Sequence, residues 1–271
     1  MQILSGHLSL VCSLDESGRS HISRQSFCAP FHISKPYQDE HALMVQVVNP
    51  TAGLFSGDSL QSEICVEHGA RLHISTPSAS RIHTMHSGRA ELHQSFHVAE
   101  AAWLEYNPAA LIPQKTGRYR QITRITLAAG AETFFIETLA PGRVARGECF
   151  EFSRIDWDLT LTYDHQLIAA ERYHLSPSDD SLAALRYPFP SAWYASGYLI
   201  TERIAPCHNC WEQIRKLNSP DVLLGASRLV KAGWSLRVVA RDNLILQKTL
   251  SSLRKIFSET IPELRSGSRK L

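Results

Sequence analysis

Apolar and polar positions alternate with a period of two along most of residues 42–176, in short segments separated by clusters of Gly, Pro, Asn, Asp and Ser. This pattern is typical of β-strands that bury one face. In the segment at 91–98, for example, Leu92, Phe96 and Val98 fall on one face, and the other face is polar. The polar face would meet solvent or line a lumen. Helical periodicity is nearly absent in this region, so we expect a mainly β body.

A weak internal repeat runs through the same region. The segments EHGARLHI, EAAWLEY and AGAETFFI align with one another, each as a corner of small residues followed by a strand. Their central alanines, Ala70, Ala102 and Ala131, are about thirty residues apart, a period that is typical of solenoid repeats. The sequence therefore predicts sheets stacked into a β-helix-like body.

The pattern changes after Ser176. The cluster SPSDDS at 176–181 has the composition of a linker, and the following RYPFPSAW holds two prolines that resist regular structure. Beyond it, CWEQIRKL has helical spacing. We therefore expect a β-rich body at 1–176 and a small C-terminal α/β extension at 177–271 that packs on the body.

The segment LILQKTLSSLRKIF predicts an amphipathic helix. Its large apolar residues recur three and four positions apart, while Lys248, Arg254 and Lys255 fall on the other face. The apolar stripe consists of Leu246, Leu250, Leu253 and Phe257. Such a stripe packs against the protein's own core or against a partner. Core packing is the commoner outcome, and the pattern alone leaves both open.

Composition narrows the range of partners. The chain carries a formal charge of only +2, and no run of like charges precedes the short basic tail around Arg265, Arg269 and Lys270. We therefore expect no nucleic-acid partner and no attachment to a membrane surface. The first residues lack the features of a signal peptide, and no segment has the apolar length of a transmembrane helix. We expect a cytoplasmic protein whose cysteines are reduced.

The motifs of common enzyme families are absent from the sequence. It contains no Walker phosphate loop, no dinucleotide fingerprint, no HExxH helix and no GxSxG elbow. No pair of nucleophile and base is legible either. We therefore expect no enzymatic activity from the chain alone.

Histidines are the most suggestive chemical feature, because imidazole is a good ligand for nickel, copper and zinc. A group of them, from His73 to His97, lies in the strand region. His93 and His97 would stand roughly 13 Å apart on one strand and so could not share an ion. His83 and His86 fall near a turn and could close on one ion, but two ligands make a weak site. Solvated surface histidines are the commoner interpretation.

Cysteines and carboxylates offer two further kinds of site. Cys207 and Cys210 have CxxC spacing, which suits a soft metal or a redox pair, although a lone CxxC is more often two ordinary thiols before a helix. Carboxylates inside a β-body can line a path for a cation, because they release such ions more readily than thiolates do. The candidates by position are Asp58, Glu137, Glu148 and Glu171. For Asp58 the alternative is a side chain that caps its own turn.

Five segments occur along the chain in a recognisable order. They are VVNPTAGLFSGD, HGARLHISTPSASRIH, LEYNPAALIPQKTGRYRQ, TLAPGRVARGECF and LIAAERYHL. Together they resemble the urease accessory proteins of the UreD (UreH) family, over about residues 26–176. The later segment LLGASRLVKAGWSLRVVARD is similar, more faintly, to the closing strand region of that family. The chain departs from the family pattern in its glycine pairs, where Ala52 and Ser56 replace glycine, and at Gln114, where an aromatic residue is common.

The resemblance implies a protein without enzymatic activity that binds UreF, reaches the GTPase UreG through UreF, and docks on apo-urease. It also implies that nickel passes through an internal polar tunnel toward the urease active site, with no cofactor bound permanently. The tunnel residues implied by their motifs are Asp58 of the GD turn, Ser80 of the TPSAS segment, Glu137 before the GR turn and Glu171 of the ER strand. Arg143 and Glu148 of GRVARGE are implied to hold their turn together.

Two alternatives stay open at the level of sequence. One is a β-solenoid metal-dependent hydrolase, which needs three ligands converging on an ion with an open position. Its ligands would come from His83, His86, His93 and Asp58. The other is an interaction scaffold that has lost metal transfer, which the altered glycine turns would permit.

Overall fold

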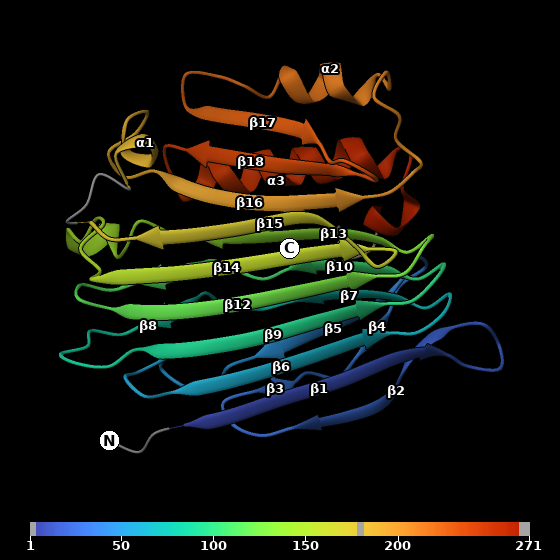
Figure 1. Ribbon diagram of the computed structural model, residues 1–271, viewed down its shortest axis with the longest axis horizontal. Helices are drawn as coiled ribbons and strands as arrows, with labels where there is room; N and C mark the ends of the chain where they lie inside the picture. The colour runs from blue at the N-terminus through green and yellow to red at the C-terminus, as the bar shows by residue number, and fades with distance from the viewer. Residues whose placement is uncertain (1–3, 178–181, 266–271) are drawn as a thin grey trace.

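The computed structural model describes residues 4–177 and 182–265. Most of the predicted linker at 176–181 lies outside these ranges, as do Arg269 and Lys270 of the basic tail. Within the described residues the protein is mainly β, with strands stacked into a β-solenoid and helices in the C-terminal part (Figure 1). The predicted fold class, a stacked-sheet body with a small C-terminal α/β extension, is confirmed.

The first of two large sheets is built mostly from parallel strands. In spatial order its strands are β15 (Gln166–Leu175), β14 (Arg154–Tyr163), β12 (Arg118–Leu127), β9 (Ala90–Val98), β6 (Ser59–Val66), β1 (Ser5–Leu14) and β2 (Ser20–Phe27). The five strands from β14 to β1 are parallel, and β15 and β2 pair antiparallel at the two edges. We call this the first sheet.

The second sheet faces the first across the core. Its main path is β17 (Val222–Arg228), β18 (Trp234–Ala240), β16 (Trp193–Ile200), β13 (Glu132–Leu139), β10 (Trp103–Asn107), β7 (Arg71–Ser75), β5 (Leu43–Val48) and β3 (His32–Ile33). The short strands β4 (Tyr37–Gln38), β8 (Ser80–Ile82) and β11 (Leu111–Pro113) join it off this path. Strands β5, β7, β10 and β13 are parallel.

Each coil of the solenoid passes from the first sheet around a corner into the second sheet. Ala70, Ala102 and Ala131 stand at three successive corners and are fully buried. The backbone N–H groups of Trp103 and Glu132 donate to the carbonyl oxygens of Ala70 and Ala102 at 2.9 and 3.0 Å. The corners therefore stack directly on one another, and only small side chains fit between them. The repeat that the sequence predicted is confirmed.

The C-terminal part continues the second sheet. Strand β16 pairs antiparallel with β13 over Thr133–Leu139, so the sheet runs unbroken from the solenoid coils into the extension. Helix α3 (Asn243–Ser258) lies against the outer face of this sheet, behind β16 and β18 in Figure 1. Asp242 caps the helix by accepting a hydrogen bond from the backbone N–H of Ile245 at 2.8 Å.

The apolar stripe predicted for α3 is confirmed, and it packs on the protein's own core. The buried residues of the helix include Leu246, Leu250, Leu253 and Phe257. Phe257 meets Phe134 of β13 edge to face, with ring centroids 5.9 Å apart. Of the two outcomes that the sequence left open, core packing is therefore the one observed.

The remaining elements are short. They are α1 (Ala183–Arg186), α2 (Cys210–Arg215), and the 3₁₀ turns at Val144–Arg146 and Pro262–Arg265. Across the first of these turns Arg143 forms an ion pair with Glu148, in which Nε donates to Oε2 at 2.8 Å, so the two residues hold their turn together as implied. Among the described helices, none has the length and apolar character needed to cross a membrane.

Candidate functional site

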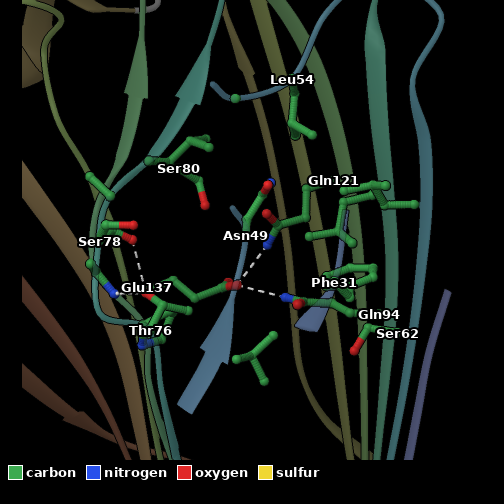
Figure 2. Close-up of a pocket in the computed structure, with 18 of the residues that line it drawn as sticks. Phe31, Asn49, Leu54, Ser62, Thr76, Ser78, Ser80, Gln94, Gln121 and Glu137 are labelled. Atoms are coloured by element: carbon green, nitrogen blue, oxygen red, sulfur yellow. Dashed lines mark hydrogen bonds between the residues drawn. The ribbon is translucent and has the colours of Figure 1, made fainter. Parts of the chain in front are cut away.

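A cavity of about 220 Å³ lies between the two sheets. Gln94 and Gln121 of the first sheet and Glu137 of the second line its inner part (Figure 2). Tyr106 of the second sheet also lines the cavity. The segments at 49–54 and 78–81, the second of which includes the start of β8, also line it. A space of this size holds several water-sized groups, and its lining is rich in oxygen and nitrogen atoms. It is the best candidate for a functional site in the described part of the chain.

The polar lining comes from inward positions of the strands. Ser62 of β6, Gln94 of β9 and Thr123 of β12 are register partners on successive strands, so their side chains stack on one face of the first sheet. Apolar residues fill most other inward positions, among them Phe96 and Ile125. A row of polar side chains inside a solenoid is costly unless its members are paired.

Glu137 faces this polar row from the second sheet. Its side chain comes from β13 and is 6% exposed. The Nε2 atoms of Gln94 and Gln121 each donate to its Oε1 at 2.6 Å, and Nε1 of Trp157 donates to its Oε2 at 3.1 Å. Both amides also donate to Oγ1 of Thr123, at 2.9 and 3.1 Å. We call Glu137, Gln94, Gln121, Thr123 and Trp157 the Glu137 network.

The charge of Glu137 is stabilised by neutral groups. Burial raises the pKa of Glu137 to about 7, and the hydrogen bonds from Gln94, Gln121 and Trp157 act in the opposite direction. At neutral pH the carboxyl is therefore partly ionised in the interior of the protein. Its contacts in the network come from amide and indole N–H groups, none of which cancels a negative charge.

Two tyrosines complete the hydrogen bonds of the glutamines. The hydroxyl of Tyr106 donates to Oε1 of Gln94 at 3.2 Å, and that of Tyr119 donates to Oε1 of Gln121 at 2.9 Å. Burial raises the pKa of both phenols, so both hydroxyls keep their protons. Each glutamine is thus held at both ends of its amide.

The structure brings two of the four predicted tunnel residues to this cavity. Ser80 and Glu137 both line it, Ser80 at the loop end and Glu137 at the inner end (Figure 2). Asp58 is 1% exposed and lies at the turn before β6, outside the lining. Its Oδ1 and Oδ2 accept from the backbone N–H groups of Leu4 and Phe55 at 2.9 and 2.8 Å. It therefore caps its turn, which was the alternative for this residue.

Glu171, the fourth residue, also points between the sheets but carries a cationic partner. It forms an ion pair with Arg237 of β18, and its Oε2 accepts from the hydroxyls of Tyr173 at 3.0 Å and Ser196 at 3.3 Å. Ser196 is the register partner of Glu137. The two carboxylates are therefore neighbours along the solenoid, with one serine between them. The joint role of the four residues as a nickel path stays a prediction.

The histidines that were candidate metal ligands do not form a common site in the described residues. His83 stacks on Phe55 with ring centroids 4.2 Å apart and has Nε2 2.9 Å from the carbonyl of Ala52. His86 and His97 are exposed. Over residues 4–177 and 182–265 no group of three His, Cys, Asp or Glu side chains is placed to hold a metal ion. The hydrolase alternative therefore lacks its ligand set in the described structure.

The CxxC cysteines have different environments. Cys207 is exposed, whereas Cys210 begins α2 and is buried, which raises the pKa of its thiol to about 11. A thiol of this kind is a poor nucleophile and a poor metal ligand at neutral pH. The arrangement matches two ordinary thiols before a helix.

Sequence reasoning missed the neutral members of the network. Gln94 sits between Leu92 and Phe96 in a strand whose inward positions are otherwise apolar, and Gln121 lies at the inward position between Tyr119 and Thr123. A long polar side chain at an inward strand position is the signal that could have identified them. Such a residue needs a buried partner, and here the partner is Glu137.

Comparison with known proteins identifies the family of the chain. The family model for UreD urease accessory protein matches residues 4–267. The urease accessory protein UreD of Opitutus terrae is 40% identical, with 98% of this chain and 99% of that protein aligned. The UreD of Acetivibrio thermocellus is 28% identical over 88% of this chain and 92% of its own length. The chain is therefore an accessory protein with a role in urease maturation and not an enzyme, and it belongs to the UreD urease accessory protein family.

Proposed function

We propose that this protein conducts nickel to the urease active site through its inter-sheet cavity, while bound to UreF, to UreG through UreF, and to apo-urease in the cytoplasm. The observation that supports this most strongly is Glu137, a buried carboxylate on a cavity wall with neutral hydrogen-bond donors. A carboxylate without a cationic partner in its network attracts a divalent cation, because the cation supplies the missing positive charge.

The chemistry of the lining suits transit better than storage. Oxygen ligands hold a borderline cation such as nickel less firmly than thiolates or clustered imidazoles do. The cavity offers oxygen atoms from Ser80 and Glu137. An ion bound by this set would leave readily, as delivery to another protein requires.

The proposed path continues past Glu137 along the solenoid. Ser196 lies next to Glu137 in register, and its hydroxyl contacts Glu171. Asp58 lies on the other side, in the turn just after the lining residue Leu54. In this proposal the ion passes Ser80, Glu137 and Glu171 in turn, and Asp58 acts by holding the turn beside the cavity.

The test is urease activation in cells with limiting nickel, in which this chain is supplied as wild type or as Glu137→Gln. This substitution keeps the size of the side chain and removes its charge. We expect activation to fall at least about tenfold, since a ligand is lost, while the complex with UreF still forms in pull-downs.

The matched control removes a buried carboxylate that lies outside the cavity together with its cation, in the double variant Glu105→Leu/Arg254→Met. It should activate urease normally. Normal activation by Glu137→Gln would sink the proposal and leave the interaction scaffold without metal transfer as the better account.

A further inference from the structure

We propose that Gln94 and Gln121 are reversible ligands: their amides donate to Glu137 when the cavity holds no cation, and turn over to present their oxygens when a divalent cation binds there. The inference rests on the proposed function, because it assumes that a cation reaches Glu137. It adds a way in which the two glutamines contact Glu137 when no cation is bound and contact the cation when one is.

The present orientation of the amides follows from the chemistry of Glu137. An ionised carboxylate only accepts hydrogen bonds, so each glutamine must turn its NH₂ group toward it. The two protons of each NH₂ are used, one on Oε1 of Glu137 and one on Oγ1 of Thr123. The oxygens of Gln94 and Gln121 point away, toward the hydroxyls of Tyr106 and Tyr119. Figure 2 shows the two amides converging on Glu137.

The same partners can also contact the amides in the reversed orientation. A tyrosine hydroxyl both donates and accepts, so after rotation of the amides Tyr106 and Tyr119 can accept from the NH₂ groups. The hydroxyl of Thr123 can then donate to one of the two amide oxygens. After the reversal each amide nitrogen keeps one acceptor, while its second proton and the hydroxyl protons of Tyr106 and Tyr119 give up their present acceptors. The observed orientation is therefore the favoured one in the empty cavity, and a cation bound by the three oxygens would stabilise the reversed one.

The reversed network forms a three-oxygen site. In it Oε1 of Glu137 and the oxygens of Gln94 and Gln121 would face one another, which is repulsive without a cation and favourable with one. The amide nitrogens now stand 2.6 Å from Oε1 of Glu137. Adjacent oxygens of an octahedral site with metal–oxygen distances of about 2.1 Å lie about 3 Å apart. For these two pairs of atoms the separation would thus need to change by only a few tenths of an ångström.

Trp157 provides a control variant for the two glutamines. Its indole N–H donates to Oε2 of Glu137, and an indole is a donor only, so it cannot become a ligand. Trp157→Phe therefore removes a donor to the same carboxylate and no ligand oxygen. Gln94→Met and Gln121→Met remove a donor and a ligand oxygen while keeping the length of the side chain.

The experiment is calorimetric titration of the full-length chain with Ni²⁺, with wild type and every variant at the same pH. We expect Gln94→Met and Gln121→Met each to weaken binding about 10- to 100-fold more than Trp157→Phe does, since only they lose a ligand. Equal effects of the three variants would overturn the inference, because they would show that the glutamines act only as donors.

Glu137→Gln separates this inference from the proposed function. If wild type binds Ni²⁺ and Glu137→Gln does not, the proposed function stands whatever the glutamine variants show. If Glu137→Gln binds as wild type does, or wild type does not bind, both the proposed function and the inference fail.

A second measurement uses the unmodified chain and so does not depend on the folding of a variant. Zn²⁺, which is diamagnetic, is added to protein labelled in its glutamine side chains, and the amide carbonyl carbons are followed by NMR. We expect the carbonyl resonances of Gln94 and Gln121 to shift on saturation, while those of Gln25 and Gln247 on the surface stay in place. Carbonyl resonances of Gln94 and Gln121 that stay in place at saturation would contradict the reversal.

Discussion

Two buried carboxylates lie on opposite faces of the second sheet, and they are stabilised in different ways. Glu105 of β10 points to the outer face, where Arg254 of α3 donates to both of its oxygens at 2.7 and 2.9 Å. Glu137 of β13 points to the inner face and accepts from the neutral groups of its network. Both side chains are almost completely buried, so the difference lies in the charge of the partners.

The comparison separates a structural charge from one that is available to a ligand. At Glu105 the bidentate guanidinium cancels the charge and ties α3 to the solenoid. His73 stands beside this pair, with Nδ1 3.4 Å from Oε2 of Glu105, and burial lowers the pKa of its ring, so it adds little charge at neutral pH. At Glu137 the negative charge is left uncancelled by its network, and a cation entering the cavity meets it directly.

The largest effect on stability is expected at the ion pair of Glu105 and Arg254 on the outer face of the second sheet. Arg254→Met leaves Glu105 buried without the cation that neutralises it, and we expect a loss of roughly 3–5 kcal/mol in the free energy of unfolding. Urea denaturation followed by circular dichroism measures it. Glu105→Leu/Arg254→Met should recover most of the loss, because the buried charge is removed together with its partner. A double variant as unstable as Arg254→Met would show that packing under α3, and not the charge, is what matters there.

On the inner face, Glu137 should make the free energy of unfolding depend on pH. The pKa of Glu137 rises from its ordinary 4.5 to about 7 on folding. Between these values the folded chain binds more protons than the unfolded one, so the contribution of Glu137 to stability is full below pH 4.5 and is lost as pH rises through about 7. The loss amounts to about 3 kcal/mol. As pH rises across this range, the unfolding free energy of wild type should fall, whereas that of Glu137→Gln should change less. Parallel profiles of the two proteins would contradict the assignment.

A smaller effect on stability is expected at Glu171, which shares features with both Glu137 and Glu105. It lies between the sheets like Glu137 but is paired with Arg237, so Glu171→Leu leaves a half-buried guanidinium unpaired. We expect a loss of roughly 1–3 kcal/mol in thermal unfolding experiments. Glu171→Leu/Arg237→Met should restore stability. If this stable double variant still fails to activate urease, Glu171 belongs to the nickel path; if it activates normally, Glu171 is structural.

Elements that are determined by residues within one short segment could be predicted from the sequence. The corners at Ala70, Ala102 and Ala131 are visible because small residues recur wherever the chain turns between sheets. The stripe of α3 is visible because helical periodicity shows in a single segment. The Glu137 network could not be predicted, since Gln94, Gln121 and Trp157 come from three strands and no single segment shows that their side chains converge on Glu137. Which carboxylate meets an arginine and which meets amides depends on contacts between distant segments, such as Glu105 with Arg254.

The central claim is that a nickel ion binds at Glu137 inside the cavity. Anomalous X-ray diffraction at the nickel absorption edge, from crystals of the full-length chain soaked with Ni²⁺, tests it most directly. We predict an anomalous peak within coordination distance of Oε1 of Glu137, absent from crystals of Glu137→Gln. Peaks confined to surface histidines such as His86 and His97, with none between the sheets, would contradict the claim.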